Sequence, residues 1–146
     1  MSAIASFTRI PVTALEELRT DYDGCMERVG ESVADYDWSG YVLATLLPYL
    51  DKRGIKLMKS GYDELAMQLS RDREATIFIF TSAHKVACLD QLSPAQFSVD
   101  EMRDYFNKFN ATNEMDIGEA MLDGIRSIHQ SLSSLDAGSV IVLCIG

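Results

Sequence analysis

Residues 114–145 read EMDIGEAMLDGIRSIHQSLSSLDAGSVIVLCI and combine a helical apolar pattern with a strand-like run. Over Glu114–Leu135, apolar side chains recur every three or four positions, which predicts an amphipathic helix. The members of this apolar stripe are Ile117, Met121, Ile125, Ile128, Leu132 and Leu135. Asp136-Ala-Gly138 ends the helix, and Ser139–Ile145 is typical of a buried strand. A long helix followed by a buried strand predicts a fold with both helices and a sheet.

Two glycines interrupt this predicted helix. Gly118 and Gly124 each weaken it by up to about 1 kcal/mol, so packing must stabilise it. Small residues at these positions also allow a neighbouring element to approach closely.

Two further segments have strand character. Residues 2–10 alternate, with Ala3, Ala5 and Phe7 on one face, and Pro11 ends the pattern. Ala75–Thr81 is rich in β-branched and aromatic residues, although such a short apolar run also fits a helix. We therefore expect a small sheet of about three strands that includes both chain termini, with the first and last strands as neighbours.

Helices are predicted between these strands. One begins near Ala14 behind a Thr13–Glu16 capping box, and a second runs from an Asp37 N-cap to about Leu50. Pro48 should kink or end the second helix near Leu47. Three shorter helices are expected at Asp63–Leu69, at His84–Leu92, and from a Ser98–Glu101 capping box to about Phe109. The expected architecture is a single α+β domain over residues 1–146, with several helices packed on the sheet.

Composition excludes several classes of protein. The 47% apolar and 24% charged residues are ordinary for a globular domain, and no apolar run approaches the length of a membrane span. The N-terminus lacks the basic segment and apolar core of a signal peptide. The three cysteines, Cys25, Cys88 and Cys144, are odd in number and widely spaced, so we interpret them as reduced thiols. These features predict a cytoplasmic protein.

The net charge of −9 bears on possible partners. Acids are concentrated in residues 14–37 and 100–123, and one basic patch comprises Lys52, Arg53, Lys56 and Lys59. Such a surface repels phosphate backbones and anionic membranes, so neither nucleic acid nor membrane is expected as a partner. It favours a basic protein partner, although acidity alone also serves solubility.

Three parts of the sequence share a pattern with a known family. These are Met1–Ile10 with the Leu/Glu-rich segment behind it, Asp37-Trp38 before an apolar helix, and Phe97–Met115 with the closing apolar strand to Gly146. Together they resemble the YfbM-like family of small bacterial proteins. The resemblance implies an α+β fold in a family of largely uncharacterised function. It implies no catalytic residues.

No motif predicts a catalytic, metal or cofactor site. His84 and Cys88 share a helical face, but a Cys–His dyad also needs an oxyanion hole that nothing here supplies. Two histidines without a Cys-x-x-Cys motif make zinc improbable. The acid pairs Asp21/Asp23 and Asp35/Asp37 lack the later ligands of a calcium loop, and glycine-rich phosphate loops are absent.

The candidate partner-binding surface combines acids with aromatic residues. Its members are Glu31, Asp35, Tyr36, Asp37, Trp38 and Tyr41. Aromatic residues dominate binding hot spots, and acids around them select a basic partner. In the alternative interpretation, Trp38 and Tyr41 pack inward while the acids are solvated.

These features favour a non-enzymatic protein-binding module. Its concrete form is an acidic immunity or inhibitor protein that neutralises a basic bacterial toxin. Two alternatives stay open. One is an enzyme with an unfamiliar site near Trp38, and the other is a homo-oligomeric scaffold in which the Glu114–Leu135 stripe faces a second copy.

Overall fold

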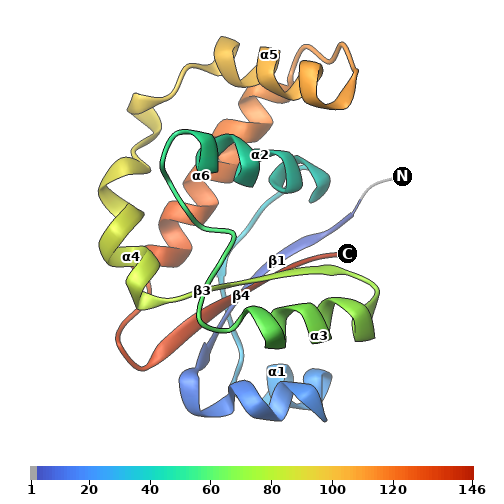
Figure 1. Ribbon diagram of the computed structural model, residues 1–146, viewed down its shortest axis with the longest axis vertical. Coiled ribbons are helices and arrows are strands. Elements are labelled where there is room, and N and C mark those ends of the chain that lie inside the picture. Colours follow the sequence, from blue (N-terminus) through green and yellow to red (C-terminus); the bar gives the residue numbers. More distant parts are fainter. Residues whose placement is uncertain (1–2) are drawn as a thin grey trace.

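Four antiparallel strands form one sheet in the structure, a computed structural model that describes residues 3–146 (Figure 1). The strands are β1 (Ala5–Pro11), β2 (Glu31–Ala34), β3 (Thr76–Phe80) and β4 (Ser139–Ile145). Their order across the sheet is β2-β1-β4-β3, so the first and last strands pair in the middle. This confirms the α+β class and the predicted adjacency of the first and last strands. Of the predicted first strand, Ser2 lies outside the described residues.

The sheet has one strand more than the sequence indicated. β2 is a four-residue edge strand that pairs with β1 across a register shift between Phe7 and Thr8. Residues Glu31–Ala34 carry only one large apolar side chain, Val33, so their own pattern gives little strand signal. The pairing partner β1 therefore defines this strand.

Helices cover both faces of the sheet, which gives three layers (Figure 1). One face carries α2 (Tyr41–Lys52), α4 (Ser82–Cys88), α5 (Val99–Asn110) and α6 (Ile117–Ser133). The other face carries a 3₁₀ helix (Val12–Arg19), α1 (Tyr22–Val29) and α3 (Asp63–Arg73). Two short 3₁₀ turns, Leu89–Gln91 and Pro94–Gln96, lead from α4 towards α5.

Successive side chains of β4 point to opposite faces of the sheet and contribute to the hydrophobic core on each face. Ile141 and Leu143 pack under α2 and α6, whereas Val140 and Val142 pack against α1 and α3. All four side chains are at most 1% exposed. A strand buried on both faces needs apolar residues at consecutive positions, which explains the unbroken run in the sequence.

The apolar stripe of α6 lies in the core of this chain. Ile125, Ile128 and Leu132 have no exposed surface. A side chain at Gly118 would overlap the Val99 carbonyl oxygen, and one at Gly124 would lie 2.7 Å from Cδ2 of Leu46. The glycines thus permit the predicted close approach of α5 and α2. The stripe is buried within this chain and therefore does not support the scaffold alternative.

Three expectations about helix ends are corrected. The helix expected from Ala14 is a 3₁₀ helix that begins after Pro11 without a side-chain cap, followed by a separate α1 whose N-cap is Asp21. Asp37 does not cap α2, which begins after Gly40. The same helix continues through Pro48.

By contrast, the predicted Ser98 N-cap of α5 is confirmed, because its hydroxyl accepts a hydrogen bond from the Glu101 N–H at 3.2 Å. Within residues 3–146, no helix combines the length and the apolarity that crossing a membrane requires.

Candidate functional site

The segment from Asp35 to Gly40 joins β2 to α2 and is fastened to α6. The Tyr36 hydroxyl donates to the Ala120 carbonyl oxygen at 2.7 Å, and the Ser127 hydroxyl donates to the Asp35 carbonyl oxygen at 2.9 Å. Burial raises the pKa of the Tyr36 hydroxyl. Tyr36 is therefore an anchor of this segment, and its hydroxyl is already occupied within the chain.

Trp38 and Tyr41 are exposed. Trp38 is 37% exposed and Tyr41 is 51% exposed, so the alternative in which both pack inward is wrong. The Trp38 indole N–H donates to Oδ2 of Asp123 at 2.8 Å, and Oδ1 of Asp123 accepts from Arg126 at 2.6 Å. The ring is thus fixed in orientation while one part of it faces solvent.

Gly40 brings this segment close to the sheet. Its N–H donates to the Ala3 carbonyl oxygen at 2.8 Å. A Cβ at this position would lie 3.0 Å from Cγ2 of Ile145 and 3.2 Å from the Ala5 nitrogen. The small residue lets α2 begin close to Ala5 and Ile145, at one end of the β1–β4 pair. Trp38 and Tyr41 therefore lie at that end of the pair.

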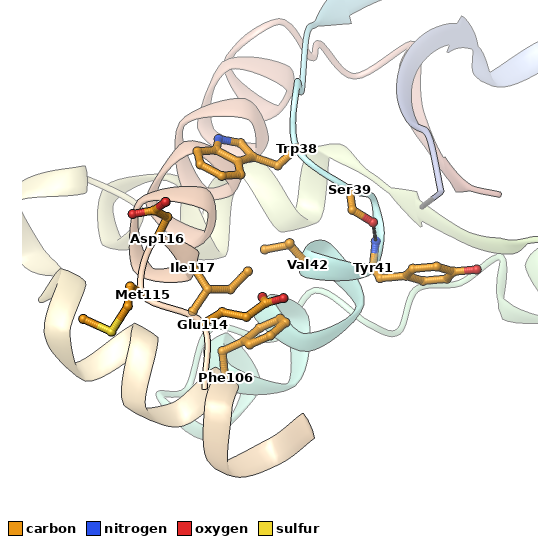
Figure 2. A pocket seen from close by; sticks show the side chains of 9 residues that line it. All are labelled: Trp38, Ser39, Tyr41, Val42, Phe106, Glu114, Met115, Asp116 and Ile117. Carbon is orange, nitrogen blue, oxygen red and sulfur yellow. Dashed lines mark hydrogen bonds between the residues drawn. The ribbon is translucent and has the colours of Figure 1, made fainter. Parts of the chain in front are cut away.

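A cleft of about 590 Å³ opens between the start of α2 and the segment that joins α5 to α6. Figure 2 shows Trp38 and Phe106 at opposite ends of the cleft, with Val42 and Ile117 between them. Two carboxylates, Glu114 and Asp116, belong to the lining and are exposed. The cleft therefore has an apolar floor and an acidic rim.

Asn107 positions the acidic rim. Its side-chain amide donates to the Glu114 carbonyl oxygen at 2.9 Å, and its Oδ1 accepts from the Glu114 N–H at 2.9 Å. The same oxygen accepts from the Thr112 hydroxyl at 2.8 Å. Three hydrogen bonds to one side chain hold the α5–α6 segment against α5, so Glu114 and Asp116 stand on an ordered loop.

A second, smaller hollow of about 280 Å³ lies on the other side of Trp38. Asp35, Asp37 and Asp123 line it together with Arg126. No base of residues 3–146 forms an ion pair with either Asp35 or Asp37. The same holds for Glu114 and Asp116 of the larger cleft.

Glu31 does not join the other predicted residues. It lies at the start of β2, pairs with Arg9 at 2.8 Å, and lines a different hollow with Asp136. The structure thus groups Asp35, Asp37, Trp38 and Tyr41 around the two hollows, buries much of Tyr36, and separates Glu31.

The His84–Cys88 dyad is not formed. The Thr81 N–H donates to Nδ1 of His84 at 2.9 Å, and Nε2 lies 2.8 Å from the Lys59 carbonyl oxygen. Burial raises the pKa of the Cys88 thiol, whose sulfur lies 3.9 Å from the Lys56 carbonyl oxygen. Both ring nitrogens of His84 are hydrogen-bonded to the backbone, so this histidine has no free nitrogen with which to activate the thiol.

The acid pair Asp21/Asp23 also has structural partners. Asp21 caps α1, and Asp23 forms an ion pair with Arg73 at 3.2 Å. In the part of the chain that the structure describes, no three histidine, cysteine or acidic residues are placed to hold a metal ion together.

Comparison with known proteins adds no relative. No family model matches the sequence, and neither the curated proteins nor the solved structures include a significant match. The resemblance to the YfbM-like family stays a prediction.

Proposed function

We propose that this chain is a non-enzymatic protein-binding module that holds a basic surface of another protein at the cleft beside Trp38. The observation that carries the proposal is the exposed aromatic cleft whose carboxylates, Glu114 and Asp116, form no ion pair with any base of residues 3–146. A half-exposed tryptophan in such a cleft has the properties of a binding hot spot.

The electrostatics of the whole chain support the same partner. With a net charge of −9, the molecule attracts basic proteins and speeds their encounter. The concrete form of the proposal is an inhibitor or immunity protein that neutralises a basic bacterial toxin. Toxins that act on nucleotides or nucleic acids need basic clefts, which an acidic surface can fill.

Two observations bear on the alternatives and on the compartment. The nine residues that line the larger cleft include two carboxylates and no histidine, lysine or arginine, which favours holding a cation. Cys25, Cys88 and Cys144 are free thiols, which supports a reducing compartment such as the cytoplasm.

The test is capture of the tagged protein's partner from its native cells, with elution by rising salt. We expect a basic protein that elutes at high salt. The double charge reversal Asp37→Lys/Asp116→Lys should weaken its capture by about tenfold or more. The control reverses Asp72 and Glu74, exposed acids in the last turn of α3 and just beyond it, and so changes the net charge equally on the other face of the sheet.

Each result decides one point. Equal loss in both double variants would assign binding to net charge rather than to the cleft. Absence of any partner at low salt would contradict the binding proposal. If the captured protein stops growth when it is expressed alone, coexpression of the wild-type chain should restore growth and the Asp37→Lys/Asp116→Lys variant should not.

A further inference from the structure

Trp38 is a partition between two acidic hollows. It lines both the cleft of about 590 Å³ and the hollow of about 280 Å³. The hydrogen bond from its indole to Asp123, 2.8 Å long, holds the ring in place between them. A partner that covers Trp38 therefore meets both hollows at once.

Both hollows carry carboxylates that lack a base within residues 3–146. Glu114 and Asp116 stand on one side of the indole, and Asp35 and Asp37 stand on the other. Among residues 3–146, Arg126 is the one base that lines the smaller hollow, and it forms an ion pair with Asp123 at 2.6 Å. Each side of Trp38 thus has a negative field that a cation from outside can neutralise.

The two hollows differ in polarity. The larger one is floored by buried apolar side chains, Val42, Phe106 and Ile117. The smaller one has Ser127 and Gln130 in its lining in addition to the charged groups. An apolar side chain gains burial only in the larger hollow, whereas the smaller one suits a cationic group alone.

We propose that this site recognises a segment of a basic partner in which positively charged side chains stand on both sides of one apolar side chain, so that the segment straddles Trp38. The apolar side chain enters the larger cleft beside one base that meets Glu114 and Asp116. The second positively charged side chain of the partner lies across the indole ring of Trp38 and pairs with Asp35 and Asp37. An arginine suits the crossing, because its guanidinium stacks on an aromatic ring while it donates to a carboxylate.

This inference rests on the proposed function and names its partner's recognition pattern. Trp38 is the only tryptophan of the chain, so its fluorescence reports directly on the site. The probes are short synthetic peptides in which two arginines flank one leucine, with glycine spacers of graded length. Matched peptides replace one arginine by glutamine, or the leucine by glycine.

The protein variants remove one rim at a time. Asp35→Asn/Asp37→Asn neutralises the smaller hollow, and Glu114→Gln/Asp116→Asn neutralises the larger. Asp72→Asn/Glu74→Gln is the control with the same change in net charge. We expect a saturable change in Trp38 emission, a loss of affinity of about tenfold in each rim variant, and unchanged affinity in the control. Loss of either arginine from the peptide should weaken binding similarly.

Three results would overturn the inference. The first is a loss of peptide affinity in only one of the two rim variants. The second is an equal loss of affinity in the control variant. The third is an unchanged Trp38 emission with every peptide. None of these contradicts the proposed function, which stands if a native basic partner is captured through Asp37 and Asp116. Absence of a native partner contradicts the proposed function itself.

Discussion

His84 illustrates how one side chain can fix a local structure through both of its ring nitrogens. It is residue N3 of α4 and completes a capping box with Thr81, a role that glutamate or glutamine usually fills. Nδ1 must be unprotonated to accept from the Thr81 N–H, so Nε2 carries the proton and donates to the Lys59 carbonyl oxygen. Burial lowers the pKa of His84, and the bond to Lys59 opposes this effect only in part.

The lowered pKa of His84 predicts a loss of stability in mild acid. The unfolded chain takes up a proton near the usual histidine pKa of about 6.5, whereas the folded chain does so only at lower pH. The contribution is therefore complete well above that value and declines as the pH falls through it and below. Urea denaturation across this pH range should show a falling unfolding free energy.

The His84→Gln variant should lose this part of the pH dependence, since glutamine can accept from Thr81 but does not titrate. His129→Gln, which removes the other histidine of the chain and leaves the Thr81–His84 capping box in place, is the matched control. An equal decline of stability in wild type and His84→Gln would show that other groups cause it.

At the scale of elements, the two glycines of α6 make a matched pair. Both lie on a buried face, but they meet different neighbours. A Cβ at Gly118 would overlap the backbone carbonyl of Val99, which cannot move without shifting the start of α5. A Cβ at Gly124 would meet the methyl ends of Leu46 and Leu43, at 2.7 and 2.9 Å. Side-chain ends can rotate away, whereas backbone cannot.

Gly118→Ala should therefore destabilise the protein more than Gly124→Ala. Alanine improves helix propensity by about 1 kcal/mol in a helix interior such as Gly124, and by less at Gly118 in the first turn. Overpacking costs about 1–3 kcal/mol, and we expect the upper part of this range only at Gly118. Unfolding free energies from urea denaturation decide the matter. A Gly118→Ala variant as stable as Gly124→Ala would show that α5 yields easily.

The elements with the clearest apolar pattern could be predicted from the sequence, because the spacing of their apolar residues alone indicates which face is buried. β4 has the predicted bounds, and α6 (Ile117–Ser133) lies within the predicted Glu114–Leu135. The first helix was not predicted correctly, because Leu15 and Leu18 are three residues apart and fit a 3₁₀ helix as well as an α-helix. β2 was missed because an edge strand of four residues depends on its partner β1.

In the candidate site, too, local features could be predicted from the sequence, whereas features that depend on tertiary packing could not. The aromatic residues Trp38 and Tyr41, with the acids Asp35 and Asp37 just before them, gave a local signal of a binding surface in the sequence. Phe106, Glu114 and Asp116 were missed, since only the packing of α5 and α6 over α2 brings them to the segment around Trp38. The side chain of Asn107, which holds this loop, gave no signal beyond its place near the end of a helix.

At the scale of the whole molecule, the pairing of β1 with β4 joins the two ends of the described chain. Ala5 is paired with Ile145 and Pro11 with Ser139. Ile4 and Gly146 also exchange two backbone hydrogen bonds, of 3.2 and 3.0 Å. Nearly the whole chain must be closed as a loop before this central pair can form, which predicts slow folding for the size of the protein.

A circular permutant should relieve this constraint and keep the fold. A short glycine–serine linker from Gly146 to the start of the chain would turn β4 and β1 into a local hairpin, and new ends at Gly61 would lie in an exposed turn with open space around it. We expect faster refolding, unchanged Trp38 emission, and a stability within about 1–2 kcal/mol of wild type. Stopped-flow refolding measures the folding rate, and urea denaturation measures the unfolding free energy. A second permutant, opened between Val142 and Leu143, cuts the strand that pairs on both sides and should not fold cooperatively. If the Gly61 permutant refolds no faster than wild type, the β1–β4 closure is not the slow step.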